Sequence, residues 1–251
     1  MKTQLIPIQD LSVLDKNAMF TLLNTHFKGV KSDVFNADLN SKNWVILLKY
    51  QNTNTLKGFS TILIYETVFQ DELITVIYSG DTIVDPSAWS TTSLSHAWIH
   101  SVKYLRQDYP HGKLYWLLIS SGYRTYRFLP VFWKEFYPVY NQQPSSKTTA
   151  LIQFLSFHQF GKNYNPETGI VRFPYPQQLR EGLDEIPPQR LNNPHIRFFV
   201  EKNPGHSQGD ELVCLTEVNE ANLTPAGQRI WFSKDRIERI FPLNQQQLLL
   251  I

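Results

Sequence analysis

Two carboxylate residues on or near the predicted central strands, Asp81 and Glu66, are the chain's first candidates for acid–base chemistry. Asp81 directly follows Gly80, which interrupts a strand pattern, and an isolated glycine in a strand often marks a bulge or a close backbone approach. A carboxylate positioned by such a feature can act as a general base. We therefore prefer Asp81 as the base. The competing interpretation is that Asp81 bonds locally or faces water.

The segment 123–140 combines many aromatic side chains with two arginines. Its eight aromatic residues are Tyr123, Tyr126, Phe128, Phe132, Trp133, Phe136, Tyr137 and Tyr140. They can wall an apolar ligand pocket, although helical aromatic residues more often belong to a core. Arg124 and Arg127 can meet a phosphate or a carboxylate, or lie on a solvated face. Arginines among aromatic residues also occur where RNA bases stack, but the near-neutral net charge argues against that function.

Metal and thiol chemistry has little support in the sequence. His96 and His100 have the i, i+4 spacing of a metal-binding pair, yet no third ligand with motif spacing accompanies them. Cys214 is the single cysteine, so a disulfide within the chain is impossible and a buried inert thiol is expected. The sequence contains no nucleophile signature, no glycine-rich dinucleotide motif and no P-loop. One unpaired cysteine fits a reducing compartment, and we predict a cytoplasmic location.

Length, charge and hydropathy exclude several further classes of protein. With 251 residues and 42% hydrophobic content, the chain can form one domain with a substantial core. Its formal net charge is +2, without blocks of like charge, so neither a nucleic-acid partner nor a membrane partner is predicted. The longest apolar runs are strand-sized, well below the roughly 20 residues of a membrane helix. No signal peptide is expected, because no apolar stretch follows Lys2.

Hydrophobic periodicity predicts the elements that must position these residues. In chain order, the first half is expected to contain helices over 11–27 and 34–39, strands over 44–50, 58–65 and 73–84, a helix over 92–107 and a strand over 114–119. Asp10 is expected to cap the first helix. The last strand is apolar throughout, which is typical of a central strand buried on both faces.

The second half is interrupted by a proline-rich stretch over 161–194, which we interpret as an ordered excursion. Around it, the sequence predicts a helix starting near Tyr123, a helix over 145–160, strands over 196–200 and 211–216, and a partly helical tail that includes 223–240 and 245–247. We therefore predict a single domain over 1–251. Its core comprises 9–140 and 195–217, with an insertion over 141–194 and a tail over 218–251.

One unit of strand, loop, helix and strand runs from Leu73 to Ile119. Its segment Tyr78 to Pro86 reads Tyr-Ser-Gly-Asp-Thr-Ile-Val-Asp-Pro, and a hairpin containing Lys57-Gly58-Phe59-Ser60 precedes it. In this element order the chain resembles the GNAT superfamily of N-acetyltransferases. The resemblance covers most of the predicted core and rests on element order more than on any short motif. It implies an α/β (α+β) fold, with a mixed, mostly antiparallel sheet flanked by helices and a C-terminal proline-rich insertion.

The resemblance implies acetyl-CoA or another acyl-CoA as co-substrate, held where a bulged strand parts from its neighbour. The implied binding residues are Ile83, Val84, Trp89, Ser90, Thr91, Thr92, Ser93 and Leu94. In the family, the loop carries Gln or Arg, then Gly and Gly or Ala, and presents backbone amides to the pyrophosphate at a helix N-terminus. Here the loop has neither the basic or amide residue nor the glycines. The alternative interpretation of its hydroxyl residues is helix capping.

The resemblance also implies transfer of an acyl group from a thioester to a small amine acceptor. Such a transfer needs a base for the amine and an acid for the departing thiolate. Asp81 is the preferred base, with Glu66 as the other carboxylate, and Tyr126 and Tyr123 are the candidate acids. Core packing of either tyrosine is the competing interpretation. The alternative function is a catalytically inactive GNAT-fold protein that binds a small molecule or a protein partner in the same cleft.

Overall fold

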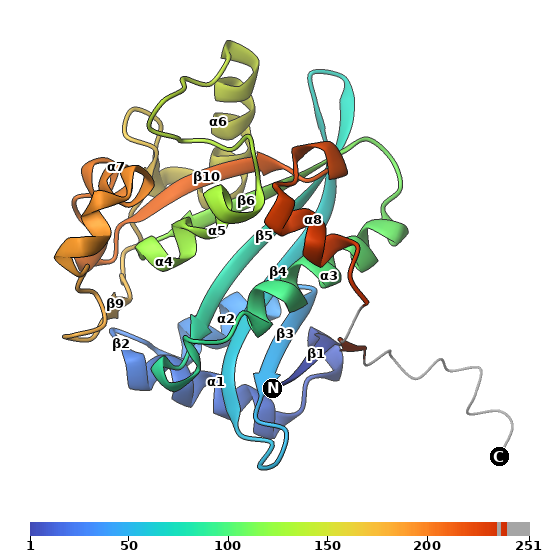
Figure 1. Cartoon of the computed structure of the whole chain (residues 1–251), viewed down its shortest axis with the longest axis vertical. Helices are drawn as coiled ribbons and strands as arrows, with labels where there is room; N and C mark the ends of the chain where they lie inside the picture. Colours follow the sequence, from blue (N-terminus) through green and yellow to red (C-terminus); the bar gives the residue numbers. More distant parts are fainter. Residues whose placement is uncertain (235–236, 240–251) are drawn as a thin grey trace, which may run out of the picture.

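The computed structural model describes residues 1–234 and 237–239, and a nine-stranded sheet runs through it (Figure 1). The spatial order is β11-β1-β3-β4-β5-β6-β10-β8-β7. Only β5–β6 and β1–β11 pair in parallel among the described strands. The strands are β1 Lys2–Pro7, β3 Trp44–Lys49, β4 Leu56–Phe69, β5 Glu72–Val84, β6 Lys113–Ser120, β7 Tyr164–Asn165, β8 Ile170–Val171, β10 Glu211–Glu217 and β11 Glu238–Arg239.

Helices cover both faces of the sheet. They are α1 Val13–His26, α2 Ser32–Asn40, α3 Ser93–Leu105, α4 Tyr123–Tyr126, α5 Phe128–Phe132, α6 Ser146–Phe160, α7 Pro194–Lys202 and α8 Pro225–Trp231. The predicted fold class, a mixed and mostly antiparallel sheet flanked by helices, is confirmed. The sheet alternates its side chains between the faces, as a period of two requires. On β3, Ile46 and Leu48 join the cluster under α3, whereas Val45 and Leu47 join the cluster under α1 and α2.

The face that carries α1 and α2 has two separate hydrophobic clusters. One lies under α1 and α2 and includes Phe35, Leu47 and Ile83. The other lies under α6 and includes Val76 and Leu117. Because no helix fills the space between these clusters, this part of the face is where a cavity can form.

The strands β5 and β6 part from one another at this position. Their parallel pairing runs from Ile74 with Lys113 to Ser79 with Leu118, and the rest of β5 has no pairing to β6. At the same point the register of β5 against β4 shifts, so that Gly80 and Asp81 together lie opposite the one residue Thr61. The bulge predicted at Gly80 is therefore confirmed. A Cβ atom at Gly80 would lie 2.7 Å from both Lys42 Cε and Thr61 Oγ1, so a side chain there would force both neighbours to move.

Most predicted elements of the first half are confirmed, with one wrong cap and two missed strands, β1 and the two-residue β2, Phe27–Lys28. The first helix begins at Val13 and is capped by Ser12, whose hydroxyl accepts from the Asp15 amide at 3.1 Å. Asp10 does not cap it, because Asp10 ends a short 3-10 turn that begins at Ile8. The strand β1 was not predicted from its six residues, yet its last four side chains are buried.

The strand predicted over 196–200 is wrong, because these residues form α7. Asn193 caps the helix by accepting from two of its first amides, and Pro194 occupies the first turn, where its missing N–H costs nothing. Ile196 and Phe199 are buried three residues apart, which is helical spacing. The strand β10 confirms the prediction over 211–216. In the tail, α8 falls within 223–240, and 245–247 lies outside the described residues.

The proline-rich stretch crosses the gap between the two clusters. Residues 173–179, here called the strap, follow β8 and end in a short strand β9, Gln178–Leu179. This strand pairs antiparallel with β2, Phe27–Lys28, at the end of α1, and the two lie side by side in Figure 1. Lys31 Nζ lies 3.5 Å from the centre of the Tyr175 ring. The strap is thus anchored at both ends. The division of the chain into core, insertion and tail remains a prediction.

Candidate functional site

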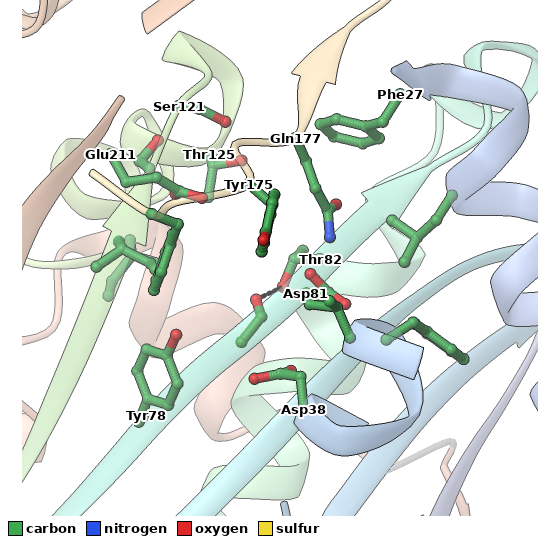
Figure 2. Close-up of a pocket in the computed structure, with 18 of the residues that line it drawn as sticks. Phe27, Asp38, Tyr78, Asp81, Thr82, Ser121, Thr125, Tyr175, Gln177 and Glu211 are labelled. Atoms are coloured by element: carbon green, nitrogen blue, oxygen red, sulfur yellow. Dashed lines mark hydrogen bonds between the residues drawn. The ribbon is translucent and has the colours of Figure 1, made fainter. Parts of the chain in front are cut away.

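A cavity of about 210 Å³ lies between the two clusters, with the β5 bulge in its wall and the strap across it (Figure 2). We call it the acid cavity. Its lining residues are Leu23, Phe27, Val34, Phe35, Asp38, Tyr78, Gly80, Asp81, Thr82, Leu118, Ile119, Ser120, Ser121, Thr125, Phe173, Pro174, Tyr175, Gln177 and Glu211. They come from α1, α2, β5, β6, α4, the strap and β10. The cavity therefore depends on the whole fold.

The bulge directs Asp81 into this cavity. Before it, Tyr78 packs in the cluster under α6, and Ser79 points to the opposite face, where it accepts hydrogen bonds from two tryptophan indoles at 3.0 Å. Beyond it, Ile83 packs under α1 and α2, on the same face as Tyr78. The extra residue shifts the alternation of β5 by one position. Asp81 consequently lies on the cavity face with Tyr78 and Ile83.

Three carboxylates from three elements surround the acid cavity. Asp38 comes from α2, Asp81 from β5 and Glu211 from the first position of β10. Lys42 forms an ion pair with Asp38, with Nζ 2.6 Å from Oδ1, and its side chain is fully buried beneath the bulge. No ion pair is found for Asp81 or Glu211 in residues 1–234 and 237–239. The cavity therefore carries more negative than positive groups.

Burial and mutual repulsion favour the protonated forms of two of these acids. Burial and the charge of Asp38 raise the pKa of Asp81 to about 7, although the ammonium of Lys42 opposes the shift. Burial and the charges of Asp81 and Asp38 raise the pKa of Glu211 to about 8. An acid whose pKa lies near neutrality can both take and release a proton there, which is the property that a general base needs.

Tyr78 contributes a buried hydroxyl to the same cavity. Only 4% of the residue is exposed, and Figure 2 shows its hydroxyl directed into the space that Asp38, Asp81 and Glu211 surround. Burial and the charges of these three acids raise the pKa of Tyr78 well above its usual value. The described part of the chain offers this hydroxyl no hydrogen-bond partner. The cavity thus holds a polar group that the protein itself does not satisfy.

A second cavity, of about 520 Å³, adjoins the first, and four residues line both: Phe27, Thr82, Ser121 and Thr125. We call it the arginine recess, because Arg124, Arg127 and Arg190 line it. One acidic residue, Asp184, lines it as well. No carboxylate forms an ion pair with any of the three arginines within the described ranges. A surplus of positive charge is typical of a site for an anion.

Arg124 is held in place by two aromatic rings. Its Cζ lies 3.8 Å from the centre of the Trp89 ring and 4.8 Å from that of Tyr123. The Trp89 indole in turn donates to the Val84 carbonyl at 2.8 Å, which ties the recess to the end of β5. Burial lowers the pKa of Arg124, as do the charges of Arg190 and Arg127, while Tyr123 acts in the opposite direction. An oriented guanidinium loses little further entropy when it binds a phosphate.

The structure brings together some of the predicted site residues. Asp81 lines the acid cavity, and Val84, Trp89 and Tyr123 line the arginine recess. Ile83, at the end of β5, packs in the cluster under α1 and α2 and also lines the arginine recess. These residues all belong to the region where β5 parts from β6.

Other predicted site residues lie outside both cavities. Tyr126 is fully buried, and its hydroxyl donates to the Pro138 carbonyl at 2.8 Å. Glu66 is exposed, and on β4 it pairs with Thr75, well before the bulge. Burial raises the pKa of Tyr126, which opposes its ionisation. The structure therefore does not bring Tyr126 or Glu66 to Asp81.

The loop before α3 keeps an open helix end. Ser90, Thr91 and Thr92 are exposed, Ser93 is half-buried, and Leu94 packs in the main core. Thr92 is the N-cap residue, but its side chain makes no capping hydrogen bond. The first amides of α3 are therefore available to an acceptor. The capping interpretation of these hydroxyls is not supported at Thr92.

The weaker signals of the sequence stay outside the site. His100 is buried and bonds Ser233 at 3.2 Å, and burial, together with the charges of His96, Lys103 and Arg239, lowers its pKa. Cys214 is a buried free thiol whose pKa is raised by burial. Across residues 1–234 and 237–239, no group of three potential metal ligands occurs. The same residues contain no helix long and apolar enough to span a membrane.

Sequence reasoning missed Asp38, Glu211, Lys42 and Arg190. Asp38 is one of several polar positions on α2, Glu211 follows a turn, and Arg190 lies in the proline-rich stretch. Nothing in their neighbouring sequence distinguishes them from solvent-exposed charges. Their significance depends on contacts between elements far apart in the chain.

The comparisons with known proteins give likenesses of fold. No protein-family model and no curated protein matches the chain. A probable N-acyltransferase of unknown function from Enterococcus faecalis is 13% identical with a TM-score of 0.39, over 54% of this chain and 33% of that one. N-myristoyltransferase of Saccharomyces cerevisiae with bound myristoyl-CoA is 15% identical with a TM-score of 0.38, over 48% and 29%.

A third solved structure, the ribosomal-protein-S18-alanine N-acetyltransferase of Escherichia coli, is 12% identical with a TM-score of 0.38, over 58% of this chain and 86% of that one. The chain thus spans a third or less of the first two proteins and most of the third. What the chain shares with these three proteins is a structural likeness. At these TM-scores it carries no conclusion about activity.

Proposed function

We propose that the protein transfers an acyl group from an acyl-CoA thioester to a small amine. One observation carries this proposal: the β5 bulge places Asp81, an acid with a pKa near neutrality, in a cavity that adjoins an arginine-lined recess. A base for the acceptor and positive charge for a phosphorylated donor are thereby set side by side. These are the two properties that such a transfer requires.

The arginine recess is the proposed site of the donor's phosphates. Arg124, Arg127 and Arg190 supply the positive charge. The uncapped N-terminus of α3 follows Trp89 in the chain but does not itself line the recess. The three arginines fit a pyrophosphate, although they differ from the glycine-rich loop that the sequence lacks. Guanidinium groups reach a phosphate through long side chains, so they do not need the close backbone approach that glycines permit.

Asp81 is the proposed catalytic base. An amine is protonated near neutral pH and cannot act as a nucleophile until it loses that proton. The Asp81 carboxylate can take it, directly or through one water molecule, because its pKa of about 7 is close to the working pH. When bound, the thioester supplies an activated acyl carbon. Of the two candidate acids, Tyr123 lines the recess and is the proposed proton donor to the thiolate.

Binding and transfer are tested separately. Calorimetry with acetyl-CoA should give a measurable dissociation constant. Arg124→Gln should weaken it by about 10-fold or more, because a charged hydrogen bond contributes roughly 1.5–3 kcal/mol. The matched control is Arg197→Gln on the exposed surface of α7, where affinity should not change.

Release of free thiol in the presence of amines reports transfer. Absence of acetyl-CoA and longer acyl-CoA binding would overturn the proposal. Binding without thiol release for any amine would instead favour the catalytically inactive binding protein.

A further inference from the structure

The acid cavity holds more carboxyl groups than a proton transfer needs. One carboxylate is enough for a base, and that role falls to Asp81. Asp38 and Glu211 remain, and only Asp38 has a cationic partner, Lys42. A half-buried carboxylate without a partner is costly in the empty protein. A second positive charge on the ligand would offset that cost.

Tyr78 gives an independent indication of a ligand. Its residue is 96% buried, yet its hydroxyl points into the cavity and finds no hydrogen-bond partner among the described residues. Besides burial, the charges of Asp38, Glu211 and Asp81 raise the pKa of this hydroxyl. A phenol oxygen can accept a hydrogen bond from an ammonium group. The cavity therefore has a neutral acceptor as well as its carboxylates.

The remaining walls define the shape of the ligand. The lining also includes the apolar side chains of Phe27, Phe35, Leu118 and Phe173, which suit a methylene chain. The other polar side chains of the lining are uncharged, among them those of Thr82, Ser121, Thr125 and Gln177. A volume of about 210 Å³ is below the roughly 300 Å³ of the smallest drug-sized pockets. The strap, held by β2 and Lys31, covers the cavity and restricts access by a folded protein or a peptide.

We propose that the acid cavity binds an aliphatic diamine or polyamine, with one ammonium at Asp81 and a second at Glu211 and the Tyr78 hydroxyl. The identity of this compound as the acyl acceptor rests on the proposed function. Its binding does not, because the proposed amine contacts, Asp81, Glu211 and Tyr78, line the acid cavity and not the arginine recess. The inference therefore has a test that uses the free protein alone.

Calorimetry on the full chain at pH 7.5 compares 1,4-diaminobutane, spermidine and n-butylamine. The diamine and spermidine should bind at least about 10-fold more tightly than n-butylamine, since one charged contact contributes that much. Glu211→Gln should abolish this preference and leave n-butylamine affinity nearly unchanged. Glu201→Gln, on the exposed surface of α7, is the matched control and should preserve the preference. Thermal unfolding midpoints of all variants verify that they fold.

Each outcome has a definite meaning. Equal affinity for mono- and diamines in the wild type overturns the second ammonium site, and so does absence of amine binding. An unchanged preference in a folded Glu211→Gln protein also overturns it. A peptide with a lysine side chain that binds more tightly than the diamine would overturn the small-molecule assignment. Diamine binding without any acyl-CoA binding would support this inference and contradict the proposed function, so the two failures are distinguishable.

Discussion

The acid cavity and the arginine recess share four wall residues but carry opposite charge. Asp38, Asp81 and Glu211 line the first, whereas Arg124, Arg127 and Arg190 line the second. In neither set does the protein neutralise the charge fully, although salt bridges between the sets would do so. Keeping them apart leaves both available to ligands. The comparison indicates one site with two halves, a cationic ligand on one side and an anionic ligand on the other.

The end of β5 creates this separation. After Ser79 the strand leaves β6, and the bulge turns Asp81 toward the α2 side, while Val84 continues to the recess. A regular strand would have kept the pairing with β6 and left no space between the two. The bulge also favours glycine at residue 80, because a Cβ atom there would displace the side chains of Lys42 and Thr61.

Removal of the Asp81 carboxylate should have the largest effect. In Asp81→Asn, acyl transfer should fall by roughly 10²–10⁴-fold, the usual contribution of a general base. The acetyl-CoA dissociation constant should stay within about twofold, because Asp81 lies outside the arginine recess. Calorimetry and thiol release measure the two quantities. Equal loss of both in a folded variant would contradict the division into two halves.

The pH dependence of transfer should show the titration of the same group. Below its pKa of about 7, Asp81 is protonated, so kcat/KM should fall about tenfold per pH unit from pH 7 to pH 5. The groups that face Asp81 in the cavity are Asp38, Lys42, Tyr78 and Glu211.

The same shift has an opposite effect on stability. Because the folded-state pKa exceeds the unfolded value of about 3.9, the folded state holds the proton more tightly. The contribution of Asp81 to the free energy of unfolding should therefore be highest below about pH 4 and be lost as the pH rises through about 7. Denaturant titrations of wild type and Asp81→Asn at pH 4 and pH 8 measure this difference. A steeper decline in the variant would assign the titration to another group.

Hydrophobic periodicity and turn residues identified most of the helices and strands, because these signals depend only on residues close together in the sequence. Gly80 within an apolar strand indicated the bulge, and Pro86 indicated where that strand ends. Competing local signals explain the error over 196–200, where β-branched and aromatic residues suggested a strand. The start signal Asn193-Pro194 outweighs them, since it satisfies the helix amides and Ile196 and Phe199 bury one helical face.

The site was accessible from the sequence only on its β5 side. Asp81 follows a visible glycine, and Trp89 follows the same strand. Glu211 and Arg190 have no such signal, because charge imbalance is a property of a cavity and not of a segment. Tyr126 shows the converse: its helix position resembled the family's, but its hydroxyl bonds Pro138 within the core. The roles of these residues depend on contacts with elements far away in the chain, which the sequence alone does not reveal.

The smallest predicted effect concerns the strap, which covers the acid cavity. Lys31→Met removes the cation–π contact with Tyr175, worth roughly 0.5–1 kcal/mol at an exposed position. The affinity for 1,4-diaminobutane should fall by about two- to fivefold, since the open strap no longer excludes water. Amide hydrogen exchange over 173–179 should become faster, while acetyl-CoA affinity should not change.

Lys28→Met is the matched control, because Lys28 is exposed on β2 and no ring contact is found for it in the described ranges. Equal exchange rates in the two variants would show that β2–β9 pairing alone holds the strap.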